Sequence, residues 1–447
     1  MEQDLTTGSV FKRIVYFSLP YLLSYFLQTL YGMADFFITG QFYGVDTITA
    51  VSNGSQIMHM MTVIIVGLAM GTTVTIGHSV GAKCMEQAEK IIGNTITLFM
   101  GIAVAFTVIL VVLVKPIVVL IATPQEAVAG TSIYLLICFI GIPFITAYNI
   151  ISSIFRGLGD SKSPMYFIGI ACVMNIALDY LFMGAFHMGA AGAALGTVCA
   201  QTFSVLVALW VIRRRKTGIS LKKSDFKIER AVIGQVLKIG IPVALQDGFI
   251  QVAFMIITVI ANSRGVSDAA AVGIVEKVIS ALFIVPSSML ATVSALSAQN
   301  FGAGKEKRAT DTLRYATVIT TIYGVIVAVL IQFIAENVVG IFTSDTTVVT
   351  MGSAYIRSYI WDCIFAGIHF SFSGYFAACG KSYIGFLHNI ISITFVRVPG
   401  SYLASKYFTD TLYPMGLAAP AGSLVSVAIC VTAFILLKRK SRVAQTA

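Results

Sequence analysis

Long apolar stretches alternate with short polar segments along the whole chain of 447 residues. Each stretch holds about 20 residues or more, which is enough for one α-helix to cross a bilayer core of about 30 Å. Gly, Pro and charged residues mark the ends of the stretches. The alternating apolar and polar positions typical of an outer-membrane barrel do not occur. The pattern predicts an all-α, polytopic membrane protein.

Twelve membrane-spanning helices are predicted, in two sets of six. The first set covers residues 14–39, 48–76, 90–114, 128–151, 163–184 and 191–212. The second set covers residues 235–262, 270–298, 311–334, 350–374, 383–404 and 414–437. We therefore expect an N-terminal six-helix lobe (1–212), a basic cytoplasmic linker (213–234) and a C-terminal six-helix lobe with a basic cytoplasmic tail (235–447).

Composition and charge support a membrane location. Hydrophobic residues make up 57% of the chain and charged residues only 11%, against about 25% charged residues in soluble domains. The net charge of +10 does not indicate nucleic-acid binding, because the basic residues lie in short loops between the spans. With both termini in the cytoplasm, most Lys and Arg residues fall on the inner side, as the positive-inside rule requires. We expect a multi-pass protein of the cell membrane in this orientation.

The two sets of spans resemble each other in sequence. "FSLPYLL" (17–23) matches "IGIPVAL" (239–245), "YGVDTITAVS" (43–52) matches "RGVSDAAAVG" (264–273), and "SVGAKCMEQAEK" (79–90) matches "NFGAGKEKRATD" (300–311), all at a nearly constant separation. Six spans separate equivalent segments, so the two halves share one orientation in the membrane. This predicts two pseudo-symmetric bundles around a central cleft, a plan used by secondary transporters.

A carboxylate in the first span needs an explanation. Asp35 is the only formally charged residue between Ile14 and Phe42, and insertion scales put its cost at roughly 2.5–3.5 kcal/mol. Tyr31 lies four residues earlier and therefore on the same face of the helix. Either Asp35 has a structural role, hydrogen-bonded to a neighbouring helix, or it binds a cation.

Two other spans of the first half carry polar residues at the same spacing. Asn175 and Asp179 share a face of the fifth span, as Ala193 and Thr197 do in the sixth. Carboxylate, amide and hydroxyl oxygens suit hard cations. Two carboxylates close together in a low dielectric repel each other, so one would readily take up a proton or a Na⁺ ion.

At this point the chain resembles the multidrug and toxic compound extrusion (MATE) family, and within it the MepA-like bacterial branch. The resemblance rests on a Pro in spans one and seven, "VGA" after span two, "FGAG" after span eight and "FRGLGDSKSPM" after span four. It implies two bundles that open alternately to either side of the membrane and export amphiphilic or cationic organic compounds in exchange for H⁺ or Na⁺. It also implies a multidrug efflux antiporter, not an enzyme, that needs no cofactor beyond the coupling ion, and we expect a monomer.

The family pattern extends to the polar residues. Relatives with a cation site in the N-terminal lobe carry Tyr-x3-Asp in span one, Asn-x3-Asp in span five and Ala-x3-Thr in span six. By this resemblance Na⁺ could bind at Asp35, Asn175, Asp179 and Thr197, with a backbone carbonyl at Ala193.

The second half differs from the first in its acids. At the separation of the repeat, Asp35 corresponds to Ile256 and Asp179 roughly to Val398, so ion coupling is assigned to the first half. Other embedded residues are expected to line the substrate cleft: Asp247, Glu276, Asp362, Met33, Phe36 and Phe283. Arg397 in span eleven needs a partner or a path to the interface. His369 and His388 are interpreted as forming hydrogen bonds between helices or, alternatively, a proton relay.

One alternative function is a lipid-linked oligosaccharide flippase of the related superfamily. Such a protein should line its cavity with several cationic residues that hold a pyrophosphate. Only Lys277 and Arg397 are candidates, against five embedded acids. An ATP-driven pump would need a Walker motif, which the sequence lacks.

Overall fold

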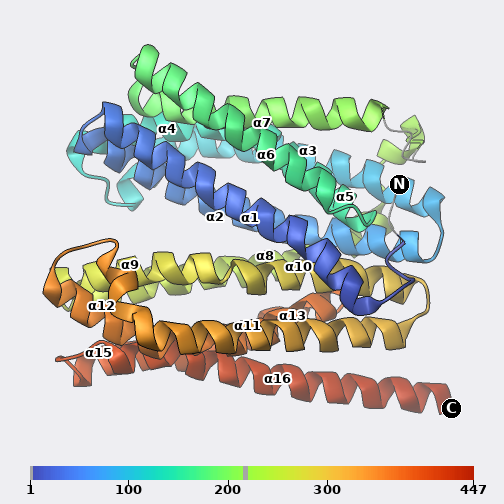
Figure 1. Cartoon of the computed structure of the whole chain (residues 1–447). Coiled ribbons are helices and arrows are strands. Elements are labelled where there is room, and N and C mark those ends of the chain that lie inside the picture. Colours follow the sequence, from blue (N-terminus) through green and yellow to red (C-terminus); the bar gives the residue numbers. More distant parts are fainter. Residues whose placement is uncertain (1–3, 215–219, 447) are drawn as a thin grey trace. The chain divides into compact units, whose positions relative to one another are not determined.

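The computed structural model describes residues 4–214 and 220–446, with side chains as far as residue 439. Figure 1 shows the chain as helices joined by short turns. Up to residue 214 these helices are α1 (Val10–Phe42), α2 (Val45–Gly81), α3 (Met85–Leu120), η1 (Gln125–Ala127), α4 (Val128–Ile140), α5 (Ile142–Gly157), α6 (Lys162–Asp179), η2 (Tyr180–Ala185) and α7 (Gly189–Arg214).

A second series of helices follows residue 220. It comprises η3 (Lys223–Phe226), α8 (Arg230–Asn262), α9 (Val266–Leu282), α10 (Ile284–Gly302), α11 (Glu306–Gly340), α12 (Thr346–Tyr359), α13 (Asp362–Ala378), α14 (Ser382–Ser392), η4 (Ile393–Arg397), α15 (Val398–Tyr407) and α16 (Tyr413–Thr446). The described residues contain no β-strand, so the all-α prediction is confirmed.

Each of the twelve predicted spans corresponds to one helix or to consecutive helices. Among the described residues, eight helices are long and apolar enough to cross a membrane, and α4 with α5 makes a ninth span bent by 51°. The other three predicted spans are also helical. Of these, α1 has 33 residues but is not among the helices apolar enough by that measure, and the regions of α12–α13 and α14–α15 are divided into helices of 17 residues or fewer.

Packing divides the chain into two compact units. The first contains Val15–Ala244 and Ala298–Gly304, together with the described N-terminal residues before Gly8. The second contains Gly8–Ile14, Leu245–Ser297 and the chain from Lys305 onward. This division falls inside α8, because the first part of α8 packs closely on α2. A Cβ atom on Gly71 of α2 would lie 2.0 Å from the carbonyl oxygen of Val236.

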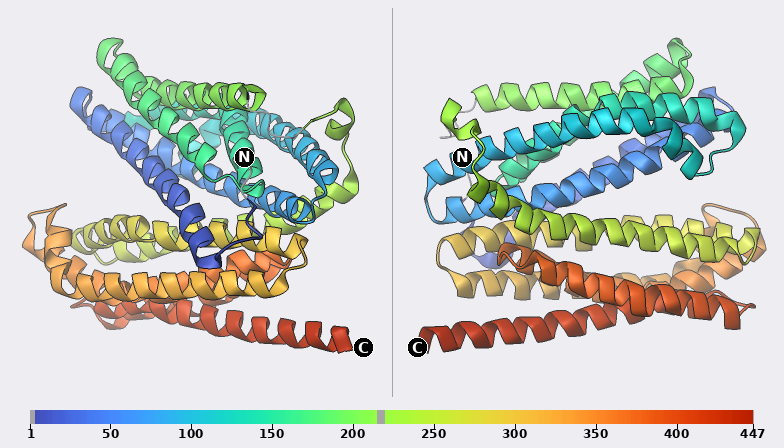
Figure 2. Two further views of the ribbon diagram at one scale, coloured as in Figure 1. Left: turned by 45° about the vertical axis from the view of Figure 1, so that its right-hand side comes forward. Right: turned by 180° about the vertical axis from the view of Figure 1, so that it is seen from behind.

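Neighbouring helices bury the apolar core of each unit. In the first unit α2 packs on α3, α4, α5 and α7, and α6 packs on α7. Figure 2 shows the helices of the chain from two further sides. In the second unit α11 packs on α13, and α12 packs on α9 and α16. Outward faces remain apolar: Val108 and Val112 of α3 are 62% and 74% exposed. A face of this kind suits lipid, since helices in a bilayer satisfy their own backbone hydrogen bonds.

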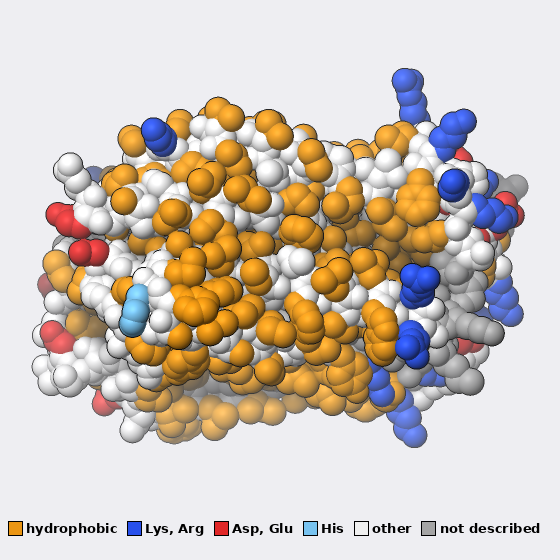
Figure 3. All heavy atoms as spheres, turned by 90° about the horizontal axis from the view of Figure 1, so that it is seen from above, with side chains coloured by type: hydrophobic (Ala, Val, Ile, Leu, Met, Phe, Trp, Pro, Cys, Tyr) orange, Lys and Arg blue, Asp and Glu red, His pale blue; other side chains and the backbone are white. Residues whose placement is uncertain are grey.

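The same apolar character is visible on the surface. On the face in Figure 3, hydrophobic side chains cover the middle and most Lys and Arg side chains gather toward one end. Helix ends of the first unit that carry basic residues include the α5 terminus with Arg156 and the α7 terminus with Arg213 and Arg214. An apolar belt next to a basic end is the distribution that the positive-inside rule describes.

The described part of the predicted linker is held against α3. The side-chain amide of Asn94 donates to the carbonyl oxygen of Asp225 at 3.1 Å, and its oxygen accepts from the backbone N–H of Glu229 at 2.7 Å. The Thr97 hydroxyl donates to the carbonyl of Phe226 at 2.9 Å. Gly93 permits this approach, because a Cβ atom there would lie 2.3 Å from the Asp225 carbonyl oxygen.

A buried arginine joins two loops of the second unit. Arg264, between α8 and α9, forms an ion pair with Asp268 at 2.7 Å. Its guanidinium also donates to four backbone carbonyls, those of Ser405 in the last turn of α15 and of Phe408, Thr409 and Thr411 between α15 and α16. Its side chain is only 7% exposed. The planar fork of donors explains the use of Arg here, because the compact ammonium of Lys could not reach as many carbonyls.

Candidate cation-coupling site

Three helices of the first unit bring the predicted polar residues together. Asp35 comes from α1, Asn175 and Asp179 come from α6, and Thr197 comes from α7. Asp35 is 3% exposed and Asp179 is fully buried. The carboxyl group of Asp35 interacts with the carboxyl group of Asp179 and with the side chains of Asn175 and Thr197. The spacing of four residues in each span thus turns the polar residues toward one place in the structure.

The side chains at this site leave many oxygen atoms without hydrogen bonds. Thr197 Oγ1 donates to Asp35 Oδ2 at 3.4 Å. Among the described residues, Asp35 Oδ1, both carboxylate oxygens of Asp179 and both polar atoms of the Asn175 amide have no hydrogen-bond partner. Buried polar groups are nearly always paired in folded proteins. A set of unpaired oxygens from two carboxylates and an amide fits a proton or a small hard cation.

A glycine on α7 allows Asp179 to reach this position. A Cβ atom on Gly196 would lie 2.1 Å from Asp179 Oδ1, far inside an ordinary contact. Gly196 precedes Thr197, so the same turn of α7 supplies a hydroxyl and makes room for a carboxylate. The sequence "AALGT" therefore has two functions at the site.

The backbone changes from an α-helix to a π-helix directly after Asp179. The π-helical turn η2 begins at Tyr180, and such turns often occur at functional sites. Tyr43 fixes the end of this turn: its hydroxyl donates to the carbonyl of Met183 at 3.0 Å and accepts from the N–H of Gly189 at 2.9 Å. These two bonds hold the connection between α6 and α7 in place.

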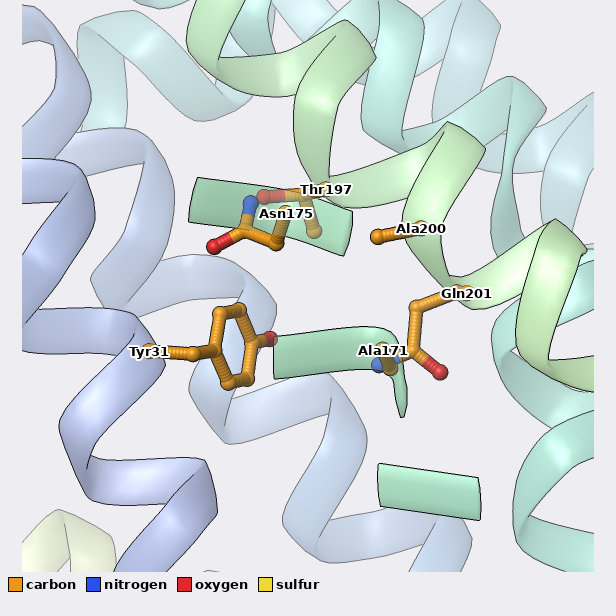
Figure 4. A pocket seen from close by; sticks show the side chains of 6 residues that line it. All are labelled: Tyr31, Ala171, Asn175, Thr197, Ala200 and Gln201. Carbon is orange, nitrogen blue, oxygen red and sulfur yellow. The ribbon is translucent and has the colours of Figure 1, made fainter. Parts of the chain in front are cut away.

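A narrow cavity extends from the site between α1, α6 and α7. About 150 Å³ of space there is free of protein atoms, part of it open to the outside, and its gaps are narrower than a water molecule. Figure 4 shows its lining, with the Tyr31 hydroxyl pointing from α1 toward the side chains of α6 and α7. The cavity is too narrow for a drug-sized molecule, and side-chain oxygens of Tyr31, Asn175 and Thr197 line it.

Gln201 lines the same cavity and was not predicted from the sequence. It is 7% exposed, and its Oε1 atom has no hydrogen-bond partner in the described part of the chain. Gln201 follows Thr197 by four residues and so continues the face formed by Ala193 and Thr197. Extending the predicted spacing by one more turn would have found it.

A family model matches most of the chain and shows which protein family it belongs to. The MatE family model matches residues 20–181 and 242–403, once in each half. The chain belongs to the MatE family. The two matches confirm the predicted repeat and, with the apolar helices, show a multi-pass membrane protein.

Relatives across the family carry multidrug names. The chain is 30% identical over 415 residues to the probable multidrug resistance protein YpnP of Bacillus subtilis, covering 93% of each protein. It is 24% identical over 374 residues to the multidrug export protein MepA of Staphylococcus aureus, covering 83% of this chain and 82% of MepA.

Solved structures of the family share the fold of the chain. A crystal structure of MATE in complex with MaL6 superposes with a TM-score of 0.91 at 20% identity, over 99% of both chains. An outward-facing multidrug resistance MATE transporter superposes with the same TM-score over 100% of this chain and 99% of that one.

The two MatE matches begin 222 residues apart, at residues 20 and 242. At this separation Ile257 and Ser401 correspond to Asp35 and Asp179, next to or near the predicted Ile256 and Val398. None of these partners is an acid, so the expectation that the second MatE repeat lacks the two carboxylates still holds.

The residues predicted to line a substrate cleft lie in different surroundings. Met33 and Phe36 are 63% and 37% exposed on α1, outside the cavity that Tyr31 lines. Asp247 is half-buried on α8, and its carboxyl group has no hydrogen bond to any described residue. Phe283 packs edge-to-face on Phe370, with 6.3 Å between the ring centres. Nothing in these contacts joins the four residues into one site.

Glu276 and Asp362 each interact electrostatically with Arg397 in the second unit. Thr258 Oγ1 donates to Glu276 Oε2 at 3.3 Å. The two embedded histidines form their own pair, with ring centres 5.3 Å apart, and His388 Nε2 lies 2.9 Å from Ser373 Oγ. The hydrogen bond joins α14 to α13, as expected for a histidine between helices.

Proposed function

We propose that this MatE protein is a secondary active antiporter that exports amphiphilic or cationic organic compounds in exchange for H⁺ or Na⁺ by alternating access. The multidrug names of its relatives support the substrate class. One structural observation carries the coupling assignment. Asp35 and Asp179, from two different helices, bring buried carboxylate oxygens without partners to the same place.

A cation bound at this place would change which arrangement of α1, α6 and α7 is preferred. Without a cation, two buried carboxylates repel each other and are poorly solvated. A proton on one carboxylate, or a Na⁺ ion between them, removes the repulsion and lets α1 approach α6. Thr197 and Asn175 would complete the ligand set for Na⁺, whereas H⁺ needs only the carboxylates. Coupling follows if the cation and the exported substrate favour different arrangements.

The same proposal includes the setting of the protein. Apolar helix faces and basic helix ends support a cell-membrane location with both termini in the cytoplasm. The partners would be small amphiphilic or cationic molecules and the lipid bilayer, with no nucleic acid. The exchanged ion would be the only cofactor, and the chain would act as a monomer.

Ethidium exchange in proteoliposomes tests the coupling assignment. We expect Asp35→Asn to bind ethidium but to lose ion-driven exchange. The neutral amide can neither take up a proton nor balance the charge of a Na⁺ ion as a carboxylate does. Asp46→Asn is the matched control: it removes an exposed acid in the first turn of α2 and should exchange ethidium at the wild-type rate. Wild-type exchange by Asp35→Asn would refute the assignment.

The coupling ion needs a separate measurement. A pH gradient without Na⁺ and a Na⁺ gradient at equal pH are imposed in turn across proteoliposomes that contain the wild-type protein. The gradient that accelerates ethidium movement identifies the ion. If neither gradient accelerates it, the antiporter proposal fails.

A further inference from the structure

A positive charge is embedded in the second unit without an ion pair. Arg397 is the last residue of the π-helical turn η4. The guanidinium donates from Nη2 to the hydroxyl of Tyr359, the last residue of α12. Among the described residues, no carboxylate lies within the 4.0 Å of an ion pair with Arg397, and its Nε atom is buried without a hydrogen bond.

Aromatic rings enclose the guanidinium instead. Its central carbon lies 4.9 Å from the ring centre of Phe254 and 5.5 Å from that of Tyr359. Both distances are within the range of about 6 Å in which a cation is attracted to the face of a ring. The Tyr359 side chain therefore contributes both a ring face and a hydroxyl acceptor to the same cation.

Two acids lie beyond ion-pair distance of the Arg397 guanidinium. Glu276 from α9 and Asp362 from the start of α13 both interact electrostatically with Arg397. Asp362 is 1% exposed, and its Oδ1 atom, like Glu276 Oε1, has no hydrogen bond to any described residue. With both acids ionised, the cluster holds two negative charges and one positive charge. Arg397 has no hydrogen bond to either acid among the described residues, so one oxygen of each acid is left for another donor.

We infer that these residues form an organic-cation receptor that the chain's own Arg397 occupies. Phe254 and Tyr359 supply the ring faces, the Tyr359 hydroxyl accepts a hydrogen bond, and Glu276 and Asp362 supply the charge. The ligand class is a guanidinium or another small monovalent organic cation. Arg397 takes the place of such a ligand within the second unit. The inference is independent of the proposed coupling site, which lies in the first unit.

Chemical rescue tests the inference without any transport assay. Arg397→Ala removes the internal cation from the purified full-length protein and should lower its Tm by several degrees. Methylguanidinium chloride at millimolar concentration should raise that Tm again, with KCl at equal ionic strength as the salt control. The methylguanidinium concentration that gives half of the maximal Tm increase of the variant should be about tenfold lower than the concentration that first changes the Tm of the wild type.

Two sets of variants separate a receptor from simple packing. Arg357→Ala, in the same unit, removes an arginine that is paired with Glu336 and 35% exposed; methylguanidinium should not restore its Tm. Adding Glu276→Gln or Asp362→Asn to Arg397→Ala should abolish the rescue.

If Arg397→Ala does not fold, the milder Arg397→Gln is titrated in the same way. Stabilisation of Arg397→Ala or Arg397→Gln no greater than that of Arg357→Ala would overturn the inference. Rescue that persists when both acids are replaced would also overturn it.

Discussion

Gly196→Ala would move Asp179 without removing its charge. The added Cβ atom would lie 2.1 Å from Asp179 Oδ1, whereas ordinary contacts begin at 3.4 Å. The oxygen must therefore retreat by about 1.3 Å, the difference between the two distances, or α6 and α7 must separate. A displacement of about 1 Å in a functional group can reduce a rate about 100-fold. Overpacking a close contact of this kind costs about 1–3 kcal/mol of stability, which a folded membrane protein can tolerate.

We expect ion-driven ethidium exchange by Gly196→Ala to fall by roughly 10- to 100-fold, with ethidium binding retained. The measurement is exchange in proteoliposomes, after size-exclusion chromatography and a Tm measurement have shown that the variant is folded. Gly101→Ala on α3 is the matched control, because a Cβ atom there meets nothing within 4 Å. A Gly196→Ala protein that exchanges ethidium at the rate of Gly101→Ala would show that the position of Asp179 is irrelevant to coupling.

Three further substitutions test contacts that position the helices. Arg264→Ala should destabilise the second unit by about 3–5 kcal/mol, seen as a lower Tm, and Arg264→Lys should recover only part of the loss because it lacks the fork of donors. Asn94→Ala removes both hydrogen bonds to the linker, each worth about 1 kcal/mol; trypsin should cut the linker faster, and an unchanged digestion rate would contradict this. Tyr43→Phe keeps the ring but loses the hydrogen bonds to the Met183 carbonyl and from the Gly189 N–H. It should lower Tm by an amount equivalent to about 1–3 kcal/mol and slow ethidium exchange. A wild-type Tm and rate would show that these bonds do not position Asp179.

The twelve helical segments were predictable because hydrophobic length is a strong signal in a membrane protein. Their internal breaks were not. The bend between α4 and α5 falls next to Gly141 and Pro143, but the sequence contains many other Gly and Pro residues that do not break a helix. The π-helical turns η2 and η4 carry no residue that marks them. Breaks of this kind depend on packing between helices, which a single sequence does not show.

The clustering of polar residues in the first unit was easier to predict than the surroundings of the residues expected at a substrate cleft, for a physical reason. Asp35, Asn175 and Thr197 were found because a polar group inside an apolar span is conspicuous, and same-face spacing then limits its partners. Met33 and Phe36 have no such contrast with their neighbours, since apolar residues occupy every face of α1. Gly196 could not be identified either, because its importance lies in the approach of Asp179 from another helix.

Two pairs of embedded carboxylates, one in each unit, lie in different surroundings. In the first unit Asp35 and Asp179 face each other with oxygens that no described cation neutralises. In the second unit Glu276 and Asp362 both interact electrostatically with Arg397, a cation that is covalently part of the chain. A tethered cation cannot leave, so it can stabilise one arrangement of helices but cannot be exchanged across the membrane. An exchangeable site must instead be left incomplete by the protein. On this reasoning the proposed exchange site belongs to the first unit, where no arginine lies beside the paired carboxylates among the described residues.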